Sequence, residues 1–284
     1  MSKKKNAVTE PQYYQSATNI QTLNYKVYYM KPLEKRLYFL GAFVVGALVG
    51  FLFYGGIGKD SYGNATVLTY ILDAVFSIGF GTIAGKLFIP MRTEQIISGR
   101  KKKLKSQFRD MLDGITTSLG AGNNIMFAFT AVYNDLQVQY PADAFIVKEL
   151  EVILSGMQSN FRIEDMLEDF GKRSGVDDIE SFANVFRVCN RKGGNIQDVI
   201  RNTHEILSQK MKMNEEIETT ISGSKMDQNI MIILPIALIA IIKLMSPEFG
   251  SYFASAAGIV ATTVAIGLFI TAYLVGKSIM NIKV

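Results

Sequence analysis

The sequence predicts an all-α, polytopic membrane protein with four transmembrane helices and a cytoplasmic antiparallel bundle of about six helices. Three observations lead to this prediction. Among 284 residues, of which 49% are hydrophobic, four long apolar runs hold few or no charges. Between residues 100 and 229, apolar residues recur at helical spacing. Strand-like alternation does not compete with that spacing, so we expect helices throughout this segment.

The four apolar runs are long enough to cross a membrane. About 20 apolar residues span about 30 Å of hydrocarbon. The third run is short by this rule and would also suit a buried core helix. Asn229 and its neighbours extend it, however, and the fourth run needs a partner crossing. We therefore expect spans at Leu37–Tyr54, Val67–Ile89, Ile230–Met245 and Gly258–Met280.

The distribution of Lys and Arg predicts the orientation of the spans. Residues 1–36 carry seven Lys/Arg and the stretch "MRTEQIISGRKKKLK" carries six, whereas the two short loops within the span pairs carry only Lys59. Loops rich in Lys and Arg stay on the cytoplasmic side. We therefore expect both termini and the long middle segment to lie in the cytoplasm. The basic residues next to the membrane are suited to anionic lipid headgroups.

These patterns divide the chain into four segments. No cleavable signal peptide is visible, so the first span is expected to direct insertion, and the first ten residues are expected to be disordered. The segments are a cytoplasmic N-terminal tail at 1–36, a first transmembrane pair at 37–90, a cytoplasmic helical domain at 91–229, and a second transmembrane pair with a short cytoplasmic tail at 230–284.

Six apolar stripes predict the helices of the 91–229 domain. They begin at Leu104, Ile125, Ile146, Ile163, Ile179 and Ile196. Glycine and asparagine punctuate the stripes and mark helix corners. In "SGVDDIE", Gly175 ends one helix, and Asp177 with Glu180 has the spacing of a capping box at the start of the next. Asparagines in "LGAGNN" are suited to open the second helix.

The corner "NRKGGNIQD" contains the first candidate site residues. Gly193 or Gly194 suits the left-handed residue after a helix, and Asn195 suits the cap of the next one. Arg191 and Lys192 precede the turn. They are cations in a domain that is net acidic, with 20 Asp/Glu against 18 Lys/Arg over residues 91–228. This balance argues against nucleic-acid binding, which favours a basic face. The two cations are either ordinary surface charges or a contact for a cytoplasmic partner.

Catalytic and metal-binding residues are scarce. The chain has one histidine, His204, and one cysteine, Cys189, which nearly excludes a structural zinc site with its four Cys/His ligands. Both lie on or beside apolar stripes, where packing explains them. No phosphate-binding loop is present, and "GFGTIA" lies inside a span, where Gly81 and Gly85 suit helix packing, as do Gly46 and Gly50. The acidic pairs around Glu164, Glu168 and Asp177 suit a divalent cation or solvated helix faces and caps. We expect neither enzymatic activity nor a cofactor.

Two charged residues fall within the spans at a similar depth. Asp73 lies about two turns into the second span, and Lys243 lies near the end of the third. An ionisable group in hydrocarbon is costly and is usually paired. We therefore expect Asp73 and Lys243 to be partners, with a protonated or water-reached carboxylate as the alternative.

The order of these parts resembles a known family. The segments that carry the resemblance are "QFRDMLDGITTSLGAGNNIMFAFTAV" and "ELEVILSGMQSNFRIEDMLEDFGKRSGVDDIESFANVFRVCNRKGGNIQDVIRNTHEIL", followed by a span that contains Pro235. They resemble the type II secretion system F-domain family, the platform proteins of type IV pilus-like machines. Within it, the layout is most like that of the TadB-like proteins of tight-adherence (Flp) pili. The resemblance covers residues 100–245, and the flanking spans match by topology only.

The resemblance implies a non-enzymatic role. Such platform proteins couple a cytoplasmic assembly ATPase to the extraction of pilin subunits from the inner membrane and to their polymerisation. The implied partners are this ATPase, a second, TadC-like platform protein, pilin subunits and the lipid bilayer, in a homo- or hetero-oligomer. The alternatives from the residues alone are a multi-span scaffold or receptor and, third, a transporter.

Overall fold

The computed structural model describes residues 10–16, 20–58, 64–246, 250 and 252–280. The chain divides into two compact units. One, which we call the core unit, contains the residues up to Tyr29 and Thr93–Met213. The other, which we call the span unit, contains Met30–Arg92 and the residues from Asn214 onward. Two long helices, α2 and α7, each contribute residues to both units.

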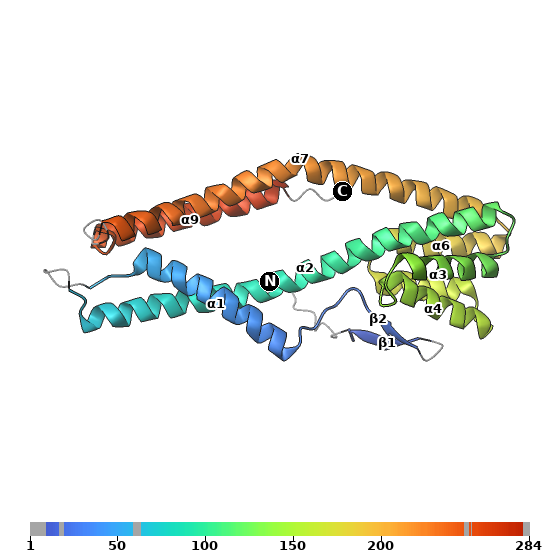
Figure 1. The fold of residues 1–284 in the computed structure, drawn as a ribbon, viewed down its shortest axis with the longest axis horizontal. Helices are drawn as coiled ribbons and strands as arrows, with labels where there is room; N and C mark the ends of the chain where they lie inside the picture. Colours follow the sequence, from blue (N-terminus) through green and yellow to red (C-terminus); the bar gives the residue numbers. More distant parts are fainter. Residues whose placement is uncertain (1–9, 17–19, 59–63, 247–249, 251, 281–284) are drawn as a thin grey trace, which may run out of the picture. The chain divides into compact units, whose positions relative to one another are not determined.

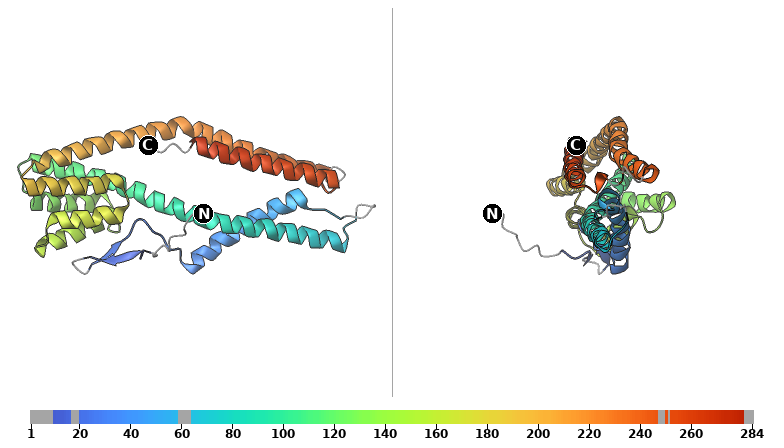
Figure 2. Two further views of the ribbon diagram at one scale, coloured as in Figure 1. Left: turned by 180° about the vertical axis from the view of Figure 1, so that it is seen from behind. Right: turned by 90° about the vertical axis from the view of Figure 1, so that its left-hand side faces the viewer.

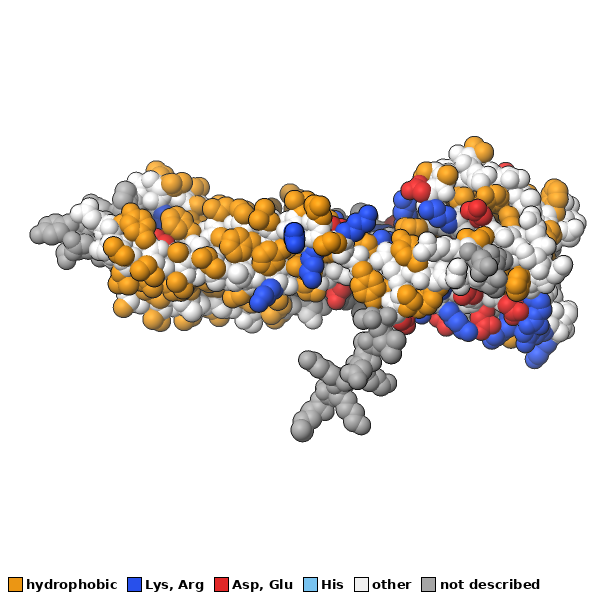
Figure 3. Space-filling view, turned by 90° about the horizontal axis from the view of Figure 1, so that it is seen from below, with side chains coloured by type: hydrophobic (Ala, Val, Ile, Leu, Met, Phe, Trp, Pro, Cys, Tyr) orange, Lys and Arg blue, Asp and Glu red, His pale blue; other side chains and the backbone are white. Residues whose placement is uncertain are grey.

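The span unit contains four helical segments long and apolar enough to cross a membrane. They are α1 (Pro32–Tyr54), part of α2 (Val67–Gly120), Met226–Met245 of α7 (Ile196–Met245), and Ala256–Gly276 of α9 (Ala256–Met280). Helix α1 crosses α2, and α9 runs back beside the end of α7 (Figures 1 and 2). Large hydrophobic side chains are exposed along all four helices, and Figure 3 shows them covering much of this part of the surface. The prediction of a multi-pass membrane protein with four spans is confirmed.

Glycines allow α1 and α2 to approach closely. A Cβ atom built on Gly46 would lie 2.6 Å from Cβ of Ala84, and one on Gly81 would lie 2.8 Å from the ring of Phe43. Neither distance leaves room for a side chain. Small residues drive helix association in membranes because they let the backbones pack against each other. The predicted packing role of Gly46 and Gly81 is confirmed.

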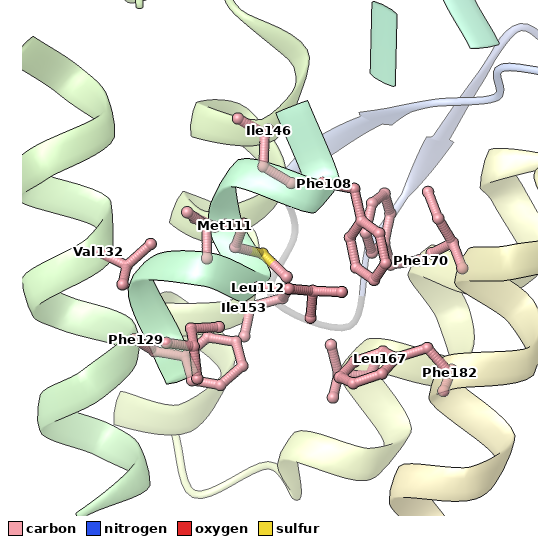
Figure 4. Packing of buried hydrophobic residues seen from close by; sticks show 14 of the residues in the cluster. Phe108, Met111, Leu112, Phe129, Val132, Ile146, Ile153, Leu167, Phe170 and Phe182 are labelled. Atoms are coloured by element: carbon pink, nitrogen blue, oxygen red, sulfur yellow. The ribbon is translucent and has the colours of Figure 1, made fainter. Parts of the chain in front are cut away.

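The helices of the core unit pack around one hydrophobic cluster. They are α3 (Ile125–Gln139), α4 (Phe145–Gln158), α5 (Ile163–Ser174) and α6 (Asp177–Lys192), with the C-terminal part of α2 and the N-terminal part of α7. Phe108 is fully buried in this cluster, with its ring 6.1 Å from that of Phe170 and 5.4 Å from that of Phe182, both edge-on (Figure 4). The residues predicted to form the helical stripes supply most of this cluster.

The N-terminal segment differs from the predicted tail. Residues 1–9, expected to be disordered, lie outside the described residues, but the segment up to Tyr29 belongs to the core unit. It forms an antiparallel hairpin of β1 (Tyr13–Gln15) and β2 (Gln21–Leu23). Tyr25 then enters the core with 1% of its surface exposed, and its ring packs edge-on against that of Phe145 at 5.4 Å. A single anchoring aromatic leaves no periodic signal, which is why the sequence pattern indicated a tail.

The helix corners follow the predicted chemistry with one exception. Asn124 caps α3 by accepting a hydrogen bond from the amide of Phe127, and Gly175 ends α5 in the left-handed conformation at φ 58°. The predicted capping box at the start of α6 is wrong. Val176 is the N-cap residue and Asp177 is already helical. The Ser174 hydroxyl instead accepts the hydrogen bond from the Val176 amide at 3.1 Å, because Gly175 turns the chain back onto it.

Candidate functional site

The corner between α6 and α7 has the conformation that its sequence predicts. Gly193 is left-handed at φ 72°, and the Gly194 amide donates to the Cys189 carbonyl at 2.8 Å. Asn195 caps α7, with its side-chain oxygen 3.4 Å from the Asp198 amide and its side-chain nitrogen 2.6 Å from the Asp198 carboxylate. The reciprocal bonds between Asn195 and Asp198 fix where α7 begins.

This corner exposes its two cations. Arg191 and Lys192 lie in the last turn of α6 and are exposed, as are Gly193, Gly194 and Asn195. Cations near a helix C-terminus interact favourably with the helix dipole, which explains their place without any partner. On the preceding turns of α6, Val185 and Val188 each expose 48% of their surface. Together these four side chains form an exposed face with apolar contact area and positive charge.

Asp73 and Lys243 reach the same turn of the span unit from two helices. The Lys243 ammonium group donates to the Leu52 carbonyl at 2.6 Å and to the Gly55 carbonyl at 3.4 Å. The Asp73 carboxylate accepts from the Gly56 amide at 2.9 Å. Among the ion pairs between described residues, a direct Asp73–Lys243 bond does not occur.

The end of α1 explains this arrangement. The last carbonyls of a helix lack partners within the helix, and an unsatisfied backbone group in hydrocarbon is costly. Lys243 supplies a charged donor to those carbonyls, while the Tyr54 hydroxyl meets the Thr263 hydroxyl of α9 at 2.9 Å. We call Tyr54, Asp73, Lys243 and Thr263 the latch, because they connect the end of α1 to α2, α7 and α9. The sequence identified the two charged members and their common level in the membrane, but not their backbone partners.

A buried ion pair fastens the N-terminal hairpin to the core unit. The two terminal nitrogens of Arg173 lie 3.0 and 2.8 Å from the two carboxylate oxygens of Glu149. The Tyr25 hydroxyl donates to the same carboxylate at 2.9 Å, and Arg173 also donates to the Leu23 carbonyl at 3.1 Å. Arg173 further binds Asp169 at 2.7 Å. Three chain segments therefore meet at one charged centre that the sequence pattern did not indicate.

The surroundings of this centre shift its pKa values. Burial, followed by the charge of Glu149 and the hydrogen bond to it, raises the pKa of Tyr25 well above its ordinary value. Burial by itself lowers the pKa of Arg173, but the hydrogen bond and charge of Glu149, reinforced by Asp169, outweigh burial and raise it. Arg173 therefore stays charged between Glu149 and Asp169, and Tyr25 stays neutral.

The remaining candidates for chemistry do not form a site. Both Ser208, at 3.3 Å, and Asp113, at 3.6 Å, contact the same nitrogen, Nε2, of His204. A catalytic relay needs its acid and its nucleophile on opposite ring nitrogens. Cys189 is a half-buried free thiol. His204 therefore makes one hydrogen bond, with Ser208 on its own helix, and lies near the Asp113 carboxylate.

Four of the six acidic residues considered as cation ligands bind basic side chains: Asp165, Glu168, Asp169 and Asp178. Glu168 contacts Lys172 at 2.8 Å and also pairs with Arg187, and the hydrogen bond from Lys172 lowers the pKa of its carboxyl group. Asp178 lies between Lys105 at 2.8 Å and Lys210 at 2.6 Å. Within the described part of the chain, no group of three His, Cys, Asp or Glu side chains is arranged to hold a metal ion.

Comparison with known proteins yields no match to any protein-family model, curated protein or solved structure.

Proposed function

We propose that the protein is a platform of a type IV pilus-like or type II secretion machine in a bacterial inner membrane, most like the TadB-like proteins of tight-adherence pili. In this role it couples a cytoplasmic assembly ATPase to pilin extraction and polymerisation, together with a TadC-like second platform protein. The observation that carries the proposal is the exposed corner at Arg191–Asn195 of an α-helical core unit, in a chain that also contains four spans. The order of parts described in the sequence supports it further.

The proposed contact with the ATPase rests on charge and exposure. Arg191 and Lys192 are exposed cations in a net acidic segment, and the neighbouring Val185 and Val188 provide apolar area that a partner can bury. Exposed charges at an interface mainly set the rate of encounter and the choice of partner. An acidic surface on the ATPase is therefore the complement that this corner fits.

Charge reversal tests this contact. The variant Arg191→Glu/Lys192→Glu should keep normal abundance, because both side chains are exposed, but should co-purify less ATPase and assemble fewer pili. The matched control is Lys148→Glu/Lys212→Glu, which makes the same charge change at two other exposed positions of the core unit. Equal losses in both variants would indicate a net-charge effect. Normal piliation of the corner variant would remove the corner as the contact.

The proposed orientation is tested with reporter fusions. Fusions after Val284 or within residues 100–228 should be active with a reporter that works only in the cytoplasm. Fusions at Tyr62 or Ser251 should be active with a reporter that works only outside. An external signal from residues 100–228 would contradict the platform role, because the ATPase has no access to that side.

A further inference from the structure

The span unit contains an apolar cavity of about 690 Å³ that neither the latch nor the proposed function uses. Side chains of α1, α2, α7 and α9 line it, among them Val49, Phe80, Ile239 and Ala265. Pro235 also lines it, at a position where α7 lacks one helical hydrogen bond. Cavities of about 300–1,000 Å³ are typical of sites that enclose a small ligand. The volume is therefore that of a binding site rather than of a packing defect.

The shape of the cavity limits what it can hold. Its lining runs along α7 from Asn229 to Ile239 and along α9 from Ala261 to Tyr273. At 1.5 Å per residue these stretches are about 15 and 18 Å long. That is roughly half of the 30 Å hydrocarbon thickness, or about one leaflet. A spanning helix of a partner protein is about 10 Å wide and needs the full thickness, so a thinner and shorter ligand fits better.

The polarity of the lining is uneven along this length. At one end lie Asn229 and Tyr273, where the Gln228 side chain donates to the Tyr273 carbonyl at 3.3 Å. Apart from Thr262, which is 6% exposed, the remaining lining is aliphatic or aromatic and includes Phe53 and Phe253. A polar ligand would lose its hydrogen bonds to water along most of the cavity. The lining therefore fits a hydrocarbon chain that carries one polar group at its Asn229 end.

We propose that this cavity holds an acyl chain of a membrane phospholipid as a resident ligand. The chain lies between α7 and α9, and the ester and headgroup lie at the end formed by Asn229 and Tyr273. The cavity belongs to helices that cross the membrane, so its surroundings supply phospholipid at high concentration. Filling it restores the dispersion contacts that an empty cavity of this size would lack.

A tryptophan placed in the cavity tests the proposal, because the natural chain contains no tryptophan. Phe269→Trp places a single indole in the lining, whereas Leu268→Trp places one on α9 at a position that is 67% exposed and does not line the cavity. Both full-length variants are reconstituted with phospholipid brominated on its acyl chains, which quenches indole fluorescence. They are then exchanged into detergent that carries no bromine.

The expected result is quenching that persists in Phe269→Trp and is lost in Leu268→Trp. Adding Ala261→Phe/Ala265→Phe, which fills the cavity from α9, should abolish the persistent quenching. Adding Val264→Phe/Leu268→Phe, an equally spaced pair on α9 that does not line the cavity, should leave it unchanged. A thermal melt of each variant shows whether it is folded.

Three results would overturn the proposal. Recovery of fluorescence in both tryptophan variants would show that no lipid is retained, and persistent quenching in both would indicate unspecific surface lipid. In a parallel experiment, brominated free fatty acid replaces the phospholipid. Persistent quenching by the fatty acid alone would identify a different ligand with the same hydrocarbon chemistry.

Discussion

Replacing Arg173 by methionine should destabilise the core unit strongly. The change removes both hydrogen bonds to Glu149 and those to Asp169 and to the Leu23 carbonyl. Glu149 exposes 2% of its surface and would retain the Tyr25 hydroxyl but lose its guanidinium partner. Removing one member of a buried ion pair costs about 3–5 kcal/mol, because the remaining charge is left uncompensated. For a domain of this size that corresponds to a fall of roughly 10–15 °C in melting temperature.

The single cysteine of the chain provides the assay. Cys189 lies on α6 in the core unit and is half-buried, so its reaction with a fluorogenic maleimide accelerates when this unit unfolds. Melts of the full-length protein in detergent therefore report on the core unit. The control is Arg162→Met, which removes an exposed ion pair with Asp165 whose arginine is 58% exposed. Exposed pairs contribute about 0–1 kcal/mol, so this variant should melt within about 3 °C of the natural protein.

A double variant separates charge from packing. Glu149→Gln/Arg173→Met removes the uncompensated charge and should recover part of the stability lost in Arg173→Met. Equal melting temperatures for Arg173→Met and Arg162→Met would refute the reasoning, since they would show that the buried pair contributes no more than an exposed one. Failure of the double variant to recover stability would assign the loss to packing.

Three further predictions concern other contacts. Gly81→Leu should lower the amount of folded protein in the membrane, because its side chain would collide with Phe43. The control Gly79→Leu faces open space and should be tolerated. Equal abundance of the two variants would contradict the close packing of α1 and α2. Lys243→Met should lower the amount of folded protein in the membrane more than Asp73→Asn, because asparagine keeps an acceptor for the Gly56 amide. Equal losses would favour a direct ion pair. Burial raises the pKa of Asp178, but hydrogen bonds from its two lysines outweigh this and lower it below its ordinary value. Because the pKa of Asp178 is lower in the folded than in the unfolded protein, its contribution to folding stability is complete above about pH 4 and is lost as the pH falls further. Asp178→Asn should therefore flatten the plot of melting temperature against pH below about pH 4.

Much of the architecture was predictable because it depends on local patterns. The stripe that begins at Leu104 is buried at Phe108, Met111 and Ile115, as helical periodicity requires. The turn at Gly193–Asn195 also follows from local chemistry, since the left-handed glycine and the asparagine cap act within a few residues.

The candidate site was only partly predictable. Asp73 and Lys243 stood out because ionisable groups are rare in spans, yet both form hydrogen bonds with backbone groups at the end of α1. A backbone partner leaves no trace in residue types, because every residue carries the same amide and carbonyl. The cavity between α7 and α9 was likewise invisible, since its lining residues look like any other residues of a span.

The sequence by itself determined the four spans, the apolar faces of the helices and the exposed basic corner, because burial of apolar surface follows the regular spacing of side chains along each helix. The tertiary structure alone decided that the segment after the hairpin enters the core and that Tyr25 meets Glu149 across 124 residues of chain. It also decided that Arg173 completes this centre. Such contacts depend on how separate helices come together in space, and the periodicity of a single helix does not record which partner its buried polar group will meet.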